Sequence, residues 1–176
     1  MAADKQFSIE IDKLTRSIEN AISGDSFKTE ILQVTLKDIK ALKTKDWLFD
    51  WKAEYKNKLS TIYKLVIVDN SNVIQGLISV EDRNDHIYMN LIESNKHNKG
   101  TRKLYIGVPG NLVAFACLLS LEKKYNGYVS FESKTKLISH YQKSLGAKIL
   151  FNNVMAIDRS AAIKLITQYF PDYLYL

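Results

Sequence analysis

Three short apolar runs, each closed by polar turn residues, occupy the middle of the chain. They are YKLVIV at residues 63–68, VIQGLISV at 73–80 and HIYMNLIE at 86–93, and the clusters DNSN and EDRND separate them. Runs of this length, rich in β-branched residues and joined by few residues, are typical of strands in consecutive hairpins. The pattern therefore predicts an antiparallel meander over residues 63–93.

A helical spacing follows this meander. Four apolar residues recur at i, i+3, i+4 and i+7 and share one helix face: Leu112, Phe115, Ala116 and Leu119. This spacing predicts a helix over residues 111–125, ended by Asn126–Gly127. The segments after it are predicted as a strand, a helix, a hairpin and a helix: residues 128–131, 136–145, 147–157 and 161–170. The order strand, helix, strand over residues 86–131 indicates a parallel crossover in the sheet.

The N-terminal third is less regular. Three apolar residues of the stretch 7–22 fit neither the period of a strand nor that of a helix: Ile9, Ile11 and Leu14. The sequence does not decide between a strand and a helix for residues 7–22, whereas residues 29–34 are predicted as a strand. Residues 36–58 are predicted as two short helices. Taken together, the elements indicate one α/β (α+β) domain with a mixed, mostly antiparallel twisted sheet and helices on both faces.

Composition narrows the chemistry. Cys117 is the only cysteine, and the three histidines are scattered, so neither a disulfide framework nor a metal site is predicted. The chain has no apolar run of about 18 residues, the length of a membrane span, and no signal pattern, so we expect a cytoplasmic protein. The net charge of +6 favours anionic ligands. The lysines are spread along the chain without a nucleic-acid-binding motif, which argues against sequence-specific nucleic-acid binding.

The stretch YIGVPGNLVAFAC at residues 105–117 has two interpretations. Its glycines either turn a strand into a core helix or let an anion approach the amides at the helix start. In the second case, the amides that converge on the anion belong to Gly107, Val108, Gly110, Asn111 and Leu112. Pro109 supplies no amide, and Arg102 and Lys103, just upstream, would meet outer phosphates. The stretch alone leaves both interpretations open.

The order of elements together with this loop resembles the GNAT acyltransferase superfamily, which uses acetyl-CoA. The resemblance covers residues 60–158, in the segments YMNLIES, YIGVPGNL, NLVAFACLLSLEKKY, YVSFESKT and KLISHYQKSLGAKIL. The segments GDSF, DWLFDW and FESKTKLISHY look like a bacterial subgroup of that superfamily. The resemblance implies one domain over residues 1–176. Its parts are N-terminal strands and acceptor-side helices (1–59), a core sheet with the CoA-binding loop (60–158) and a C-terminal helix (159–176).

The resemblance also implies where the cofactor lies. The exposed backbone of the third meander strand would pair with the pantetheine arm as an added strand does, and the glycine loop would hold the pyrophosphate. The cofactor-binding residues implied in this way are Leu91, Ile92, Glu93, Gly107, Val108, Gly110, Asn111, Leu112, Lys134 and Tyr141. Trp47 and Trp51 would wall the acceptor site or pack in the core.

Acyl transfer to an amine needs a base for the amine and an acid for the leaving thiolate. We predict Glu93 as the base, because it ends the third strand beside the implied thioester site and follows two apolar residues. Tyr141 is predicted as the acid, on a helix face shared with apolar residues. Other candidates weigh less: Glu81, Asp82, Glu132, His140 and Cys117.

The predicted function is therefore acetyl-CoA-dependent transfer of an acetyl group to an amine of a small molecule or a protein. An inactive GNAT-like module that binds CoA or a protein is the alternative, and a basic nucleic-acid-binding protein is a third. The acceptor and the oligomeric state stay open, with a homodimer among the options.

Overall fold

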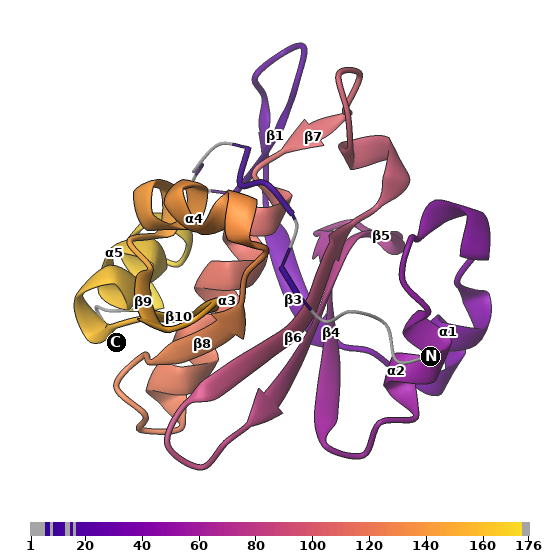
Figure 1. Cartoon of the computed structure of the whole chain (residues 1–176). Helices are drawn as coiled ribbons and strands as arrows, with labels where there is room; N and C mark the ends of the chain where they lie inside the picture. The colour runs from indigo at the N-terminus through magenta and orange to yellow at the C-terminus, as the bar shows by residue number, and fades with distance from the viewer. Residues whose placement is uncertain (1–5, 8, 13–14, 16, 174–176) are drawn as a thin grey trace.

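A seven-stranded sheet forms the centre of the computed structural model, which describes residues 6–7, 9–12, 15 and 17–173 (Figure 1). Its strand order is β3–β4–β5–β6–β8–β10–β9. The strands are β3 (Thr29–Gln33), β4 (Ser60–Ile67), β5 (Asn70–Asp82), β6 (Ile87–Ser94), β8 (Val129–Glu132), β9 (Lys148–Phe151) and β10 (Val154–Ile157). Among these strands only β6 and β8 run parallel. The predicted mixed, mostly antiparallel sheet with its meander and parallel crossover is confirmed.

Helices cover both faces of this sheet, as predicted. The helices are α1 (Leu36–Ala41), α2 (Trp51–Tyr55), α3 (Val108–Glu122), α4 (Ile138–Leu145) and α5 (Arg159–Tyr169), with short 3₁₀ turns η1 (Thr44–Asp46), η2 (Lys96–Asn98) and η3 (Thr135–Leu137). Alternate residues of the central strands point to opposite faces. Leu77 and Leu91 pack with α1 and α2, whereas Ile78 and Ile92 pack with α3 and α5.

Helix α3 begins at Val108, three residues before the predicted start. Gly107 precedes it in the left-handed region at φ 91°, and Pro109 lies in the first turn, where a missing amide hydrogen costs no helical bond. The prediction was wrong because it took the glycines and the proline as loop residues. Close packing fixes the helix on the sheet: a Cβ on Gly76 of β5 would lie 2.6 Å from Val108 Cγ1 and 2.9 Å from Leu112 Cδ1.

The stretch 7–22, for which the sequence allowed either a strand or a helix, forms a strand near its C-terminal end. Strand β1 (Ile18–Asn20) pairs with β2 (Ser26–Phe27) and with β7 (Tyr105–Ile106), which no periodicity had indicated. Before β1 the described residues run along α4 without regular structure, and Leu14 lies outside the described residues. The β1–β7 pairing brings described residues just before β1, such as Thr15 and Ser17, next to Gly107.

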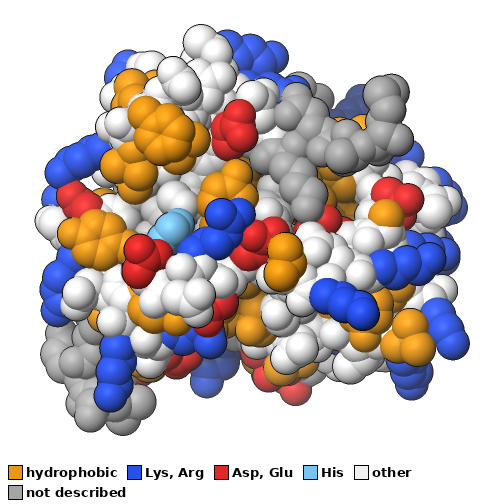
Figure 2. Space-filling model, turned by 60° about the horizontal axis from the view of Figure 1, so that its bottom comes forward, with side chains coloured by type: hydrophobic (Ala, Val, Ile, Leu, Met, Phe, Trp, Pro, Cys, Tyr) orange, Lys and Arg blue, Asp and Glu red, His pale blue; other side chains and the backbone are white. Residues whose placement is uncertain are grey.

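On one face of the molecule, charged side chains of both signs are interspersed. Figure 2 shows Lys and Arg side chains distributed over one face of the molecule, with acidic side chains between them. None of the helices in the described part of the chain is long and apolar enough to cross a membrane.

Candidate functional site

The parallel strands β6 and β8 separate soon after they meet. They pair only at Ile87–Val129 and Tyr88–Ser130, and Figure 1 shows them opening apart beyond this point. A β-bulge at Asn90 bends β6 there, since the pairing with β5 passes from Ser79–Leu91 directly to Val80–Met89. The later part of β6 therefore turns one backbone edge toward the gap between the strands.

The first turn of α3 lies at the far end of this gap. The Gly107 amide donates to the Asp12 carboxylate at 3.2 Å, and the Asn111 amide donates to the Gly107 carbonyl at 3.1 Å. The Asn111 amide is thus used inside the helix and is not offered to a ligand. Its side-chain Oδ1 is buried with no hydrogen-bond partner, so a polar acceptor stands unused at the helix start.

Glu93 faces α1 and α2 and is 2% exposed. Its carboxylate accepts from the Leu48 amide (2.6 Å), the Phe49 amide (3.1 Å), the Trp51 indole N–H (2.9 Å) and the Lys99 ammonium (2.6 Å). A carboxylate offers about four acceptor positions, so Glu93 is saturated in this conformation. It ties β6 to the loop before α2, and its role as a base stays a prediction.

Tyr141 of α4 is fully buried, against Phe7 and Phe131. Its hydroxyl donates to the Ile9 carbonyl. Burial raises the pKa of Tyr141 well above its usual value, and nearby Glu10 adds to this effect. The hydroxyl is therefore neutral and can donate a proton, but its hydrogen bond is made to the backbone carbonyl of Ile9. No described hydrogen bond joins Tyr141 to Glu93.

The remaining candidates have partners or are distant from the gap. Glu81 accepts from Asn90 and Arg83, and Asp82 accepts from the Tyr125 hydroxyl. Glu132 accepts from the Gln6 side chain at 3.1 Å. These carboxylates support the strands around the gap.

Three further candidates are also accounted for. His140 Nε2 accepts from the Ile11 amide at 2.8 Å, so that nitrogen carries no proton. Cys117 is buried inside α3, and burial raises the pKa of its thiol, which makes it a core residue without nucleophilic character. The Lys134 amide donates to the Phe7 carbonyl at 3.0 Å.

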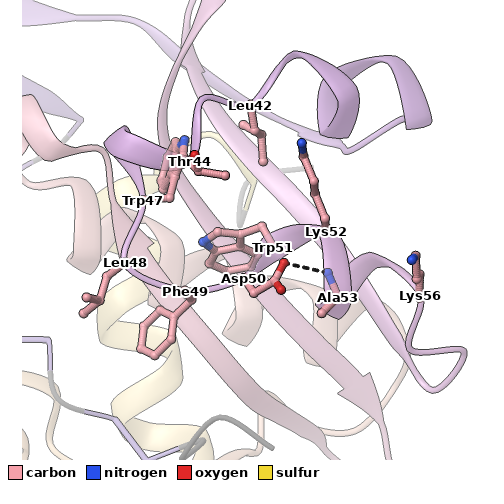
Figure 3. A pocket seen from close by; sticks show the side chains of 10 residues that line it. All are labelled: Leu42, Thr44, Trp47, Leu48, Phe49, Asp50, Trp51, Lys52, Ala53 and Lys56. Carbon is pink, nitrogen blue, oxygen red and sulfur yellow. Dashed lines mark hydrogen bonds between the residues drawn. The ribbon is translucent and has the colours of Figure 1, made fainter. Parts of the chain in front are cut away.

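Two hollows lie beside helices α1 and α2. One, of about 620 Å³, lies around the loop before α2 and includes Trp47 and Trp51 (Figure 3). The two indoles pack edge to face at 6.5 Å and are largely buried, so both serve the core as well as the cavity wall. The other, of about 1020 Å³, lies between α1 and the loop after β6. Its basic lining residues are Lys37, Lys43, Lys64, Lys96, Lys99 and Arg102.

No group of three or more metal-ligating side chains occurs within the described ranges of the chain.

No protein-family model matches the sequence, and no curated protein matches it. The fold itself is found in solved structures. The chain is similar to one in the KacTA–DNA complex, at 12% identity and a TM-score of 0.52, over 80% of this chain and 99% of that chain. It is also similar to one in AtaTR bound with AcCoA, at 13% identity and a TM-score of 0.52, over 79% and 98%.

A third match is a mutant AtaT toxin bound to the C-terminus of the antitoxin AtaR, at 14% identity and a TM-score of 0.51, over 80% and 98%. These likenesses show the fold, which is GNAT-like. The chain has the GNAT fold.

The sequence did not predict that Asp12 and Lys99 contact the site, where Asp12 accepts from Gly107 and Lys99 donates to Glu93. Asp12 lies in the irregular N-terminal stretch and Lys99 in a polar loop, and neither place carries a periodic signal.

Proposed function

We propose that the protein is an acetyl-CoA-dependent N-acyltransferase that transfers an acetyl group directly to an amine. The observation that carries the proposal is the separation of β6 from β8 beside the first turn of α3. That arrangement leaves a free strand edge and helix-start amides around one gap, which suits a long thiol cofactor with a phosphorylated end. A neighbour of the same fold is recorded with AcCoA, which supports this choice.

The residues of the gap fit this cofactor under one condition. The edge of β6 at Leu91–Glu93 would pair with its amide-bearing arm, and the amides of Gly107, Val108 and Gly110 would receive its phosphates. When bound, acetyl-CoA supplies a thioester whose acetyl group is the one transferred. In the conformation described here, however, Gly107 already donates to Asp12, and a Cβ at Gly107 would meet Thr15. The cofactor therefore fits once Asp12 and Thr15 move away from Gly107.

Within the site, Tyr141 would protonate the leaving thiolate once Phe7 and Ile9 move, since its hydroxyl is neutral and is bonded only to the Ile9 carbonyl among the described contacts. Glu93 would act as base only after releasing donors; in the described conformation it holds the acceptor-side loop against β6. Lys134, at the end of β8, would contact the cofactor through its amide. The acceptor amine, on a small molecule or a protein, would enter beside Trp47 and Trp51.

Acetyl-CoA binding, measured by calorimetry, tests the proposal, together with acetyl transfer over a panel of amines. Gly110→Asp adds bulk and negative charge at the helix start and should weaken binding at least tenfold. Tyr141→Phe should lower turnover by about 10²-fold, the contribution of a general acid, with little loss of cofactor affinity. Tyr125→Phe, a tyrosine bonded to Asp82 outside the gap, is the matched control. Equal turnover of Tyr141→Phe and wild type would remove Tyr141 from the acid role.

A second candidate is a GNAT-fold module that binds CoA without catalysis. The saturated carboxylate of Glu93 and the engaged hydroxyl of Tyr141 favour it. It predicts acetyl-CoA binding by calorimetry with no acetyl transfer to any amine of the panel.

A further inference from the structure

The described residues 6–7 and 9–12 lie against β8, α4 and the start of α3. The Phe7 amide donates to the Glu132 carbonyl at 2.6 Å, and the Lys134 amide donates to the Phe7 carbonyl at 3.0 Å. Phe7 thereby forms a parallel bridge with Ser133, directly beyond the end of β8. Its ring is 2% exposed and lies 4.8 Å from that of Phe131, so this contact is a packed one.

The next described residues occupy the helix α4 side of the gap. The Ile9 carbonyl accepts the hydroxyl hydrogen of Tyr141, and the Ile11 amide donates to His140 Nε2 at 2.8 Å. Ile11 is 6% exposed. Two polar side chains of α4, those of Tyr141 and His140, are thus bonded to backbone groups of Ile9 and Ile11.

Asp12 completes the series at the start of α3. Its carboxylate accepts from the Gly107 amide at 3.2 and 3.4 Å and pairs with the Lys103 ammonium at 3.3 Å. A helix start favours negative charge, and the carboxyl side chain is only 14% exposed. An anion is therefore already bound at the amide where the cofactor's pyrophosphate is proposed to lie.

We propose that the described residues 6–7 and 9–12 are an internal competitor of the cofactor. Phe7 and Ile9 bind groups along β8 and α4, and the Asp12 carboxylate occupies the place of a phosphate at Gly107. This inference rests on the proposed function. It makes cofactor binding conditional on release of the segment, so the apparent affinity is the intrinsic affinity reduced by the fraction of molecules in which the segment is released. Strand β1, paired with β7, anchors the segment from its C-terminal side.

Amide hydrogen exchange of the full, unmodified chain, followed residue by residue by NMR, tests the displacement. Without ligand, the amides of Phe7 and Ile11 are expected to be protected by their partners. At saturating acetyl-CoA their exchange should rise at least tenfold, while the Ala21 amide, bonded to Leu104 in the small sheet, should not become faster. Continued protection of Phe7 and Ile11 with the cofactor bound would overturn the inference.

Calorimetry with a charge-neutral variant tests the anion contact. Asp12→Asn keeps the shape and removes the charge, so the dissociation constant for acetyl-CoA should fall about three- to tenfold, the worth of a charge-assisted contact. Glu10→Gln is the matched control, because it removes the same charge from an exposed residue of the same segment. Its effect should stay within about twofold. Equal shifts in both variants would indicate a general charge effect and would overturn the proposed contact.

The two levels of proposal fail differently. If wild type, Asp12→Asn and Glu10→Gln all lack measurable acetyl-CoA binding, the proposed function is wrong, and the competition falls with it. If all three bind with equal affinity and Phe7 stays protected, only the competition is wrong, and the proposed function stands.

Discussion

The carboxylate of Glu93 joins the sheet to the loop before α2, so its replacement by glutamine is an informative perturbation. Glu93→Gln keeps the size of the side chain but removes the charge and replaces one acceptor oxygen with an NH₂ donor. In the native site, this group meets the amides of Leu48 and Phe49 and the indole N–H of Trp51, all of them donors. A glutamine oxygen cannot serve all three, and the new NH₂ faces at least one of them.

The magnitude follows from these contacts. One buried N–H left without an acceptor costs about 1–3 kcal/mol, and the remaining bonds lose charge assistance worth about 1 kcal/mol in total. The ion pair with Lys99 adds little, because the Lys99 side chain is 40% exposed and solvent screens it. We therefore expect the free energy of unfolding to fall by about 2–4 kcal/mol, a large share of the 5–15 kcal/mol typical of a domain.

Urea denaturation followed by tryptophan fluorescence measures this loss, since Trp51 donates to Glu93 and Trp47 packs against Trp51. With a slope of roughly 2 kcal/mol per molar urea, the midpoint should fall by about 1–2 M. Glu122→Gln, a change at an exposed site of α3, is the control and should stay within about 0.5 kcal/mol. A Glu93→Gln midpoint equal to that of wild type, with acetyl transfer abolished, would refute the structural role and support the base assignment.

Two further predictions concern the backbone and the dependence of stability on pH. Gly107→Ala should lower the free energy of unfolding by about 2–4 kcal/mol, because φ is +91° and a Cβ would lie 2.7 Å from a carbonyl oxygen; Gly100→Ala, at φ +75° with open space, should cost about 1–2 kcal/mol by the same urea assay. Burial alone would raise the pKa of Asp38, but hydrogen bonds from Lys64 and Thr35 outweigh it and lower the pKa below 3.8. Its contribution to stability is therefore present above about pH 4 and lost as the pH falls through the lowered pKa, so Asp38→Asn should flatten the acid limb of the stability curve. An unchanged acid limb would contradict this assignment.

Local pattern accounts for most of the elements. The apolar runs at residues 63–93 are strands because their lengths and turn clusters suit consecutive hairpins, and the two short helices before them follow from local capping, as at Thr35 and Asp38. The start of α3 was misplaced because Gly107, Pro109 and Gly110 carry loop propensity, whereas in the fold Val108 and Leu112 of the first helical turns pack against Gly76.

The sequence by itself determined the order of strands and helices, the parallel crossover and the resemblance that points to acetyl-CoA, because these depend on periodicity and local motifs. Only the tertiary structure decided which groups meet at the site. The contact of Asp12 with Gly107 spans 95 positions and that of Tyr141 with Ile9 spans 132. No local spacing encodes such contacts; they depend on the pairing of β1 with β7, which accompanies the contacts of Ile9 with α4 and of Asp12 with the start of α3.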